Sequence, residues 1–171
     1  FLLLDGNRLQ DFSSIKKWPN LQYLDLSDTG IKDLSILASL KELGALGLAY
    51  NELEDLSEMP VLEQLSSLYI GGNDLSSLNG IERLKGLTEL SLSENESLTG
   101  IEELTALKDL QYLDLSLTSI ESIQPLLALD HLVMVFLMEI ETLDLTDGSE
   151  GLDVITQLRD KGVYVEYEYE E

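Results

Sequence analysis

The sequence predicts an α/β repeat solenoid, in which short parallel strands and tight helical turns stack along one axis. Three observations lead to this fold class. Leucines recur every 22 residues, each repeat holds a short alternating apolar segment, and the pattern changes only near Ile140. A single repeat of this length cannot bury its own apolar side chains, whereas a stack of repeats buries them in one continuous core.

The repeat has the pattern L-x-x-L-x-L-x-x-N. Its first column is Leu21, Leu43, Leu65, Leu87, Leu110 and Leu132. Its second column is Leu2, Leu24, Leu46, Leu68, Leu90, Leu113 and Val135, and its third is Leu4, Leu26, Leu48, Ile70, Leu92, Leu115 and Leu137. One residue is inserted between Asn95 and Leu98. Since every column returns to register afterwards, we interpret this insertion as a local bulge in a loop.

The L-x-L segment of each repeat predicts a short strand. Alternate side chains of a strand point to the same side, so both leucines face the core. We expect about eight short parallel strands on the concave side of a right-handed solenoid. They are centred near Leu3, Asp25, Gly47, Tyr69, Ser91, Asp114, Phe136 and Tyr164.

A polar column follows each strand, at the point where the chain must turn. It consists of Asn7, Thr29, Asn51, Asn73, Asn95, Thr118 and Ile140. An Asn amide both donates and accepts hydrogen bonds, so stacked Asn side chains can satisfy the backbone of adjacent turns. Threonine can do part of this and Ile140 cannot, which marks the start of a C-terminal cap.

The convex side is expected to carry short, 3₁₀-like turns. Ser13, Ser35, Ser57 and Asn79 lie where such turns need an N-cap, and Asn79 with Glu82 has capping-box spacing. The last apolar column is Trp18, Leu40, Leu62, Leu84, Leu107 and Leu129. Trp18 is therefore predicted to be a core residue.

The C-terminal segment departs from the repeat. Apolar spacing predicts a helix over about 151–161, Gly162 suits its C-cap, and 163–165 reads as a final strand. We therefore divide the chain into leucine-rich repeats at 1–139, with the first repeat truncated, and an irregular last repeat and cap at 140–171. Residues 1–4 would form an uncovered apolar edge, so we expect the natural protein to carry a capping element upstream.

These columns resemble the leucine-rich repeat family, in its 22-residue subclass of bacterial internalin-like surface proteins and eukaryotic phosphatase-regulator-like proteins. The resemblance covers about residues 1–140, and the ending ITQLRDKGVYVEY is similar to that of bacterial members. It implies a protein-binding module used through its concave face, carried on or exported from a bacterial cell. Two alternatives stay open: an intracellular scaffold of the phosphatase-regulator type, and the repeat portion of a larger enzyme.

Composition narrows the partner classes. The formal net charge of −23 argues against nucleic acid and anionic membranes, and favours a protein partner with a neutral or basic surface. The absence of Cys excludes disulfides, Cys-based zinc sites and a thiol nucleophile, and no apolar run is long enough to insert in a membrane. The single histidine, His131, is read as a solvated loop residue. The acidic loop over 144–153 lacks EF-hand spacing. We expect no cofactor, no metal and no catalytic residue.

The outward strand positions are not needed for the core, so they are the candidate ligand-binding residues. They are Tyr23, Asp25, Tyr69, Glu89, Tyr112, Asp114, Met134, Phe136, Met138 and Tyr164. Small residues occupy the middle of this face: Ala45, Gly47, Ala49, Ser67, Gly71, Ser91 and Ser93. The C-terminal half is the preferred binding site, because aromatic residues and Met are enriched at interface centres. Coverage by the cap or by a second copy of the chain, as a homodimer, is the alternative.

Overall fold

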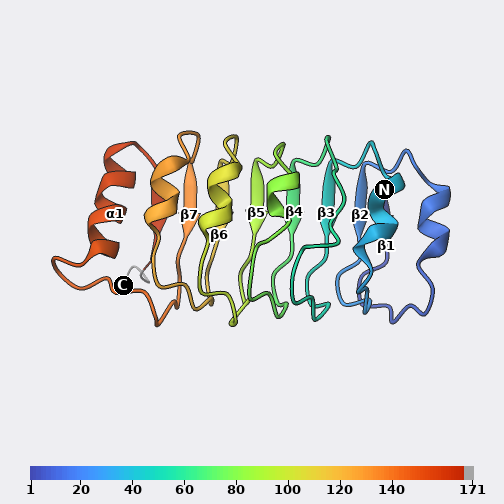
Figure 1. The fold of residues 1–171 in the computed structure, drawn as a ribbon, viewed down its shortest axis with the longest axis horizontal. Helices are drawn as coiled ribbons and strands as arrows, with labels where there is room; N and C mark the ends of the chain where they lie inside the picture. The colour runs from blue at the N-terminus through green and yellow to red at the C-terminus, as the bar shows by residue number, and fades with distance from the viewer. Residues whose placement is uncertain (168–171) are drawn as a thin grey trace.

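The computed structural model describes residues 1–167. In this part of the chain, eight parallel strands form one open sheet in sequence order (Figure 1). The strands are β1 (Leu2–Leu3), β2 (Tyr23–Asp25), β3 (Ala45–Gly47), β4 (Ser67–Tyr69), β5 (Glu89–Ser91), β6 (Tyr112–Asp114), β7 (Met134–Phe136) and β8 (Tyr164–Glu166). The predicted solenoid and the predicted strand centres are confirmed.

The strand register follows the leucine columns. Leu46 of β3 pairs with Leu24 on one side and Leu68 on the other, and Leu90 pairs with Leu113. The extra residue after Asn95 leaves the sheet undisturbed, because the register continues directly across β5 and β6. The insertion is therefore absorbed in a loop, as predicted.

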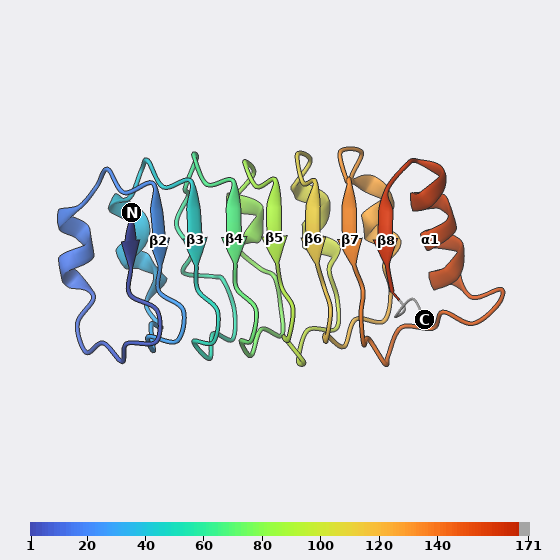
Figure 2. The same cartoon turned by 180° about the vertical axis from the view of Figure 1, so that it is seen from behind.

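Short 3₁₀ helices lie on the opposite side of the solenoid. All but the first lie in front of the strands in Figure 1 and behind them in Figure 2, and the first stands beyond β1 at the N-terminal end. They are η1 (Ser13–Lys17), η2 (Leu34–Ser39), η3 (Ile81–Arg83), η4 (Glu102–Ala106) and η5 (Gln124–Ala128). Between the two sides, the inward columns pack into one continuous core whose leucines are almost fully buried. Each repeat is therefore a thin slice of that core.

The polar column forms a ladder of hydrogen bonds inside the core. The Asn73 amide donates to the carbonyls of Leu48, Ile70 and Gly71, and its Oδ1 accepts the backbone N–H groups of Asn51 and Leu53. Asn51, Asn73 and Asn95 thus each close their own turn and tie it to the preceding repeat. The Thr29 and Thr118 hydroxyls donate to a carbonyl of their own turn, and the Thr29 hydroxyl also lies 3.4 Å from Asn51 Oδ1. The Ile140 side chain, which has no polar group, packs against the core instead.

The residue before each member of the polar column has a left-handed backbone. Gly6, Asp28, Tyr50, Gly72, Glu94, Leu117 and Glu139 all have φ between 50° and 68°. Glycine adopts this conformation without a steric penalty, whereas other residues are strained there. The turn geometry is thus imposed by the ladder and the sheet, and not by the residue type at this position.

The capping residues of the 3₁₀ turns differ from the prediction. The cap of η2 is Asp33, whose carboxylate accepts the backbone N–H and the hydroxyl of Ser35. Asp11 and Asp55 bind the serine two residues later in the same way. The predicted serines are thus donors to the capping aspartate. In η3 the cap is Gly80, whose N–H donates to Glu82, so the expected pairing with Asn79 is wrong.

The C-terminal end is closed by helix α1 (Glu150–Asp160). Its N-cap is Ser149, whose hydroxyl accepts the Leu152 N–H. Val154, Ile155 and Leu158 are buried against the last repeat. Gly162, at φ 89°, leads into β8, which begins one residue later than predicted. The division of the chain between residues 139 and 140 stays a prediction.

Trp18 is the clearest error of the sequence-based core. It is 48% exposed, whereas Leu40 and Leu62, in the same column, are buried. The η2 repeat covers the Trp18 side chain on one side. The described residues place no repeat on its other side. Trp18 instead borders a shallow apolar depression with Phe1, Leu2 and Leu21.

Candidate binding face of the sheet

The outward strand positions form two parallel rows across the sheet. The first row is Tyr23, Ala45, Ser67, Glu89, Tyr112, Met134 and Tyr164. The second row is Leu3, Asp25, Gly47, Tyr69, Ser91, Asp114, Phe136 and Glu166. Neighbours in a row lie on adjacent strands, about 4.8 Å apart. Residues widely separated in sequence therefore form one continuous surface.

The C-terminal part of this surface holds a group of large apolar side chains. We call Tyr112, Met134, Phe136, Met138 and Tyr164 the C-terminal patch. Met134 lies between Tyr112 and Tyr164 in the first row, and Phe136 lies between Asp114 and Glu166 in the second. Tyr112 is 43% exposed, Tyr164 is 50% exposed, and the other three are half-buried. The register thus brings four of these residues together, and Met138 follows Phe136 by two residues, just beyond the end of β7.

Helix α1 does not lie over this patch. It packs against β8 and η5, and in Figure 2 it stands beyond the last strand at the end of the sheet. The patch is therefore open on its outward side in the described part of the chain. The half-burial of Phe136 comes from its neighbours within the sheet.

The predicted residues of the N-terminal half lie apart from this patch. The Tyr23 ring stacks on Phe1, with the ring centroids 5.8 Å apart. The Asp25 carboxylate leans over Gly47, where an added Cβ atom would lie 2.5 Å from Asp25 Oδ1. The ten predicted residues thus share one face but do not form one site.

A hollow of about 270 Å³ opens between the two halves, over β5 and its neighbours. We call it the central hollow. The side chains around it are Tyr69, Glu89, Ser91, Tyr112, Asp114 and Phe136. Five of these were predicted as ligand-binding residues, but Ser91 was noted only as a small residue. Its place in the second row, between the larger residues Tyr69 and Asp114, could have indicated that it forms the floor of a hollow.

The charged side chains in the two rows are all negative. The charged residues in the two rows are Asp25, Glu89, Asp114 and Glu166, and no Lys or Arg occupies these strand positions. Burial raises the pKa of the Tyr69 phenol, and its hydrogen bond to the Glu89 carboxylate raises it further. Tyr69 therefore stays neutral at physiological pH beside the carboxylate of Glu89.

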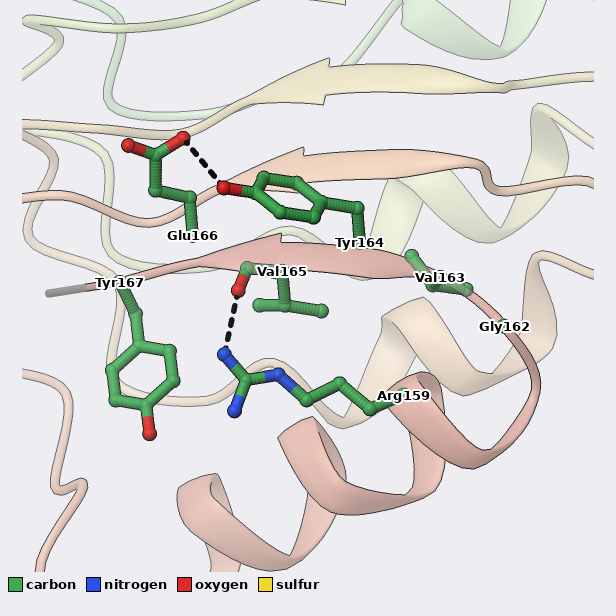
Figure 3. A pocket seen from close by; sticks show the side chains of 7 residues that line it. All are labelled: Arg159, Gly162, Val163, Tyr164, Val165, Glu166 and Tyr167. Atoms are coloured by element: carbon green, nitrogen blue, oxygen red, sulfur yellow. Dashed lines mark hydrogen bonds between the residues drawn. The ribbon is translucent and has the colours of Figure 1, made fainter. Parts of the chain in front are cut away.

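A second, larger pocket lies at the sheet edge between α1 and β8 (Figure 3). There the Arg159 guanidinium donates to the Val165 carbonyl at 2.9 Å and stands 5.0 Å from the centre of the Tyr167 ring. The carbonyl is one that an additional strand would otherwise use. Arg159 thus blocks the exposed edge of the sheet, a common protection against unwanted strand pairing.

The described residues contain no cluster of side chains that could hold a metal ion: residues 1–167 hold no group of three or more His, Asp or Glu side chains placed to bind one. His131 is largely exposed and its Nδ1 lies 2.8 Å from the Lys108 carbonyl oxygen. Over the same residues, no helix has the length and apolar character needed to cross a membrane.

Comparison with known proteins agrees with the repeat architecture. A family profile for leucine-rich repeats, two copies, matches residues 19–64. A comparison with curated proteins gives no significant match.

Solved structures extend the likeness along the chain. Internalin C2 of Listeria monocytogenes superposes with a TM-score of 0.74 at 24% identity, over 89% of this chain and 64% of its own. An internalin F structure from the same species gives 0.65 at 24% identity, over 95% and 54%. A leucine-rich repeat protein of Leptospira interrogans gives 0.64 at 26% identity, over 76% and 33%.

This chain thus spans about a third to two thirds of the length of the solved chains it resembles. Its repeat profile, its stacked parallel strands and its superposition on these structures agree with one another. The chain thus has the leucine-rich repeat solenoid fold, in a form similar to that of the internalins.

Proposed function

We propose that this chain is a non-catalytic protein-interaction module that binds a protein partner through the C-terminal patch. The observation that carries the proposal is the patch itself, in which Tyr112, Met134 and Tyr164 stand side by side on adjacent strands. Exposed apolar groups of this kind commonly mark interaction surfaces.

The chemistry of the patch suits a protein partner. Tyrosine offers a large apolar ring with a polar tip, and methionine adapts its shape to the partner. The acidic residues at its margin, Asp114 and Glu166, favour a neutral or basic partner and disfavour nucleic acid. A second copy of this chain would present the same acidic side chains, so a face-to-face homodimer is disfavoured.

The proposal includes display on, or export from, a bacterial cell. Its support is the internalin-like fold, since the compared structures come from Listeria and Leptospira. The test is the location of the full-length gene product, by cell fractionation. Recovery only from the cytoplasm would contradict this part and leave the binding proposal intact.

The binding proposal is tested with two variants that each remove an apolar side chain. Phe136→Ala removes the centre of the patch, while Val61→Ala, whose side chain is 50% exposed, lies outside the two rows and serves as the matched control. Proteins captured by the immobilised wild-type chain are tested again against both variants by surface plasmon resonance. We expect Phe136→Ala to weaken binding at least about ten-fold and Val61→Ala to leave it unchanged.

Equal binding of captured proteins by the wild type and Phe136→Ala would contradict the proposed face. The melting temperature of each variant is measured in parallel. A large loss of stability in Phe136→Ala would identify Phe136 as part of the core, and Tyr164→Ala then replaces it as the test variant.

A further inference from the structure

We propose that the central hollow binds one cationic side chain of the partner, an arginine in preference to a lysine. This inference rests on the proposed function, because it describes how the same face recognises its partner. It adds a specific recognition point over β5, at the edge of the C-terminal patch, whose Tyr112 and Phe136 line the hollow.

The hollow, of about 270 Å³, has room for the end of one side chain. Ser91 forms its floor, and Tyr69 and Asp114 flank Ser91 on the two neighbouring strands. Two strand spacings separate the backbones of Tyr69 and Asp114 by roughly 10 Å. A serine at the midpoint leaves this interval open above the sheet.

A neighbouring position with similar residues has no such opening. Gly47 also lies between an aspartate and a tyrosine, Asp25 and Tyr69, on adjacent strands. There, however, the Asp25 carboxylate leans over the glycine and occupies the space. The combination of acid, small residue and aromatic ring is therefore open only where Ser91 forms the floor.

The walls of the hollow supply both interactions that a guanidinium uses. The rings of Tyr69, Tyr112 and Phe136 offer π faces, on which arginine stacks readily. Glu89 and Asp114 offer carboxylates, which pair with the fork of guanidinium N–H groups. Arginine is preferred because its planar, weakly hydrated group uses rings and carboxylates together.

One carboxylate oxygen is available for this contact. Asp114 Oδ1 accepts the backbone N–H of Ser116 at 3.0 Å, and within residues 1–167 no donor reaches Oδ2. Glu89 Oε2 accepts the Ser67 hydroxyl at 3.2 Å, which holds this carboxylate toward β4 and at the margin of the hollow. Together the two residues place negative charge on both sides of Ser91, with no cation of the chain in the two rows to neutralise it.

The test uses two small probes that differ in charge and not in shape. N-acetyl-arginine amide carries the guanidinium, and N-acetyl-citrulline amide carries a neutral urea of the same size. Each is titrated into the ¹⁵N-labelled chain at low salt while backbone amide shifts are followed by NMR. We expect saturable shifts at Ser91, Leu113 and Asp114 with the arginine probe, and at least about five-fold weaker binding of the citrulline probe.

Matched variants separate the hollow from the general charge. Asp114→Asn keeps an oxygen to accept the Ser116 N–H but removes the charge, and should weaken the arginine probe about five-fold. Asp25→Asn is the control, because Asp25 has the same repeat position and accepts the Ser27 N–H at 2.9 Å. It should change the affinity less than two-fold. Tyr112→Leu, which keeps an apolar side chain without the π face, should weaken binding about three-fold.

The inference is overturned by equal binding of the two probes, by equal effects of Asp25→Asn and Asp114→Asn, or by shifts that do not saturate. Those outcomes leave the proposed function standing if Phe136→Ala still abolishes partner binding. Conversely, probe binding at the hollow without any effect of Phe136→Ala on the partner would contradict the proposed function alone.

Discussion

Trp18 and Leu40 occupy the same column of successive repeats, yet Leu40 is fully buried and Trp18 is 48% exposed. The same contrast holds for the polar column, since Asn73 is 4% exposed and makes five hydrogen bonds, while Asn7 is exposed and makes two. In a solenoid, a side chain is buried by the repeats on both of its sides and not by its own repeat. Position along the stack therefore decides how much a column residue contributes to stability.

The largest effect is expected from truncating a leucine in the middle of the stack. Leu68 is fully buried and pairs in register with Leu46 and Leu90. Leu68→Ala should destabilise the chain by roughly 2–5 kcal/mol, because the strands on both sides limit collapse into the cavity. Urea denaturation measures this, with Leu2→Ala in the half-buried edge strand as control. Equal losses from both substitutions would contradict the contrast between inner and end repeats.

The asparagine ladder should show the same contrast at a slightly smaller scale. Asn73→Ala leaves the buried N–H groups of Asn51 and Leu53 without partners, and each such group costs about 1–3 kcal/mol. The carbonyls that Asn73 also binds keep a bond from another donor. We expect a total of about 2–4 kcal/mol after partial rescue by water. Asn7→Ala should cost less than about 0.5 kcal/mol, because its turn is already solvated. Thermal unfolding of the two variants checks the difference, and a costly Asn7→Ala would show that the end turn depends on the ladder.

The sequence predicts these two columns well because both follow from the repeat period. Strand positions, register and the asparagine contacts depend on the repeat spacing alone, and this spacing can be read directly from the sequence. The exposure of Trp18 was missed because the column rule assumes a neighbour on both sides. The left-handed column gave little signal, since Tyr50, Glu94 and Leu117 belong to residue types that rarely adopt this conformation.

The candidate site was predictable in part for the same reason. Alternation along a strand identifies which side chains point outward, and the register then fixes their neighbours, as for Met134 between Tyr112 and Tyr164. The central hollow depends instead on how individual side chains lean. The Asp25 carboxylate fills the space above Gly47, whereas Asp114 leaves the space above Ser91 open, and no repeat pattern distinguishes these two cases.

A smaller effect, with the opposite sign, is expected at a left-handed position. Leu117 has φ 58° and is 39% exposed, so removing its side chain costs less packing than removing a fully buried leucine. Leu117→Gly should raise stability by about 0.5–1 kcal/mol, because the relieved backbone strain exceeds the added entropy of the unfolded chain. Gly72 shows that the turn accepts glycine at this column position. A measured loss of stability by urea denaturation would mean that Leu117 contributes packing that its exposure does not suggest.

The smallest effect concerns a local hydrogen bond whose contribution to stability should not depend on where its repeat lies in the stack. Asp11, in the end repeat, and Asp33, in an inner one, each accept hydrogen bonds only from the serine two residues later. In the folded chain, these bonds lower the pKa of both carboxyls below the ordinary value of 3.8. The largest cause is the hydrogen bond from the Ser35 side chain for Asp33, and the hydrogen bond from the Ser13 backbone for Asp11. Asp11→Ala and Asp33→Ala should therefore destabilise by similar small amounts at pH 7, unlike the leucine and asparagine pairs.

The pH dependence of this last effect has a definite sign. A carboxyl whose pKa is lower in the folded chain stabilises the fold above its unfolded pKa, and this contribution is lost as the pH falls through the folded value. The stability gap between wild type and either variant should be constant from pH 7 to pH 5 and should shrink below about pH 3.8. Relief of the overall negative charge by acid affects wild type and variant alike, so it cancels in the gap. Urea denaturation at pH 7, 5 and 3 measures this stability gap.

A gap that widens in acid would show that the aspartates cap these turns by some means other than their charge. A gap present only for Asp33 would show that even this local contact depends on the repeats around it.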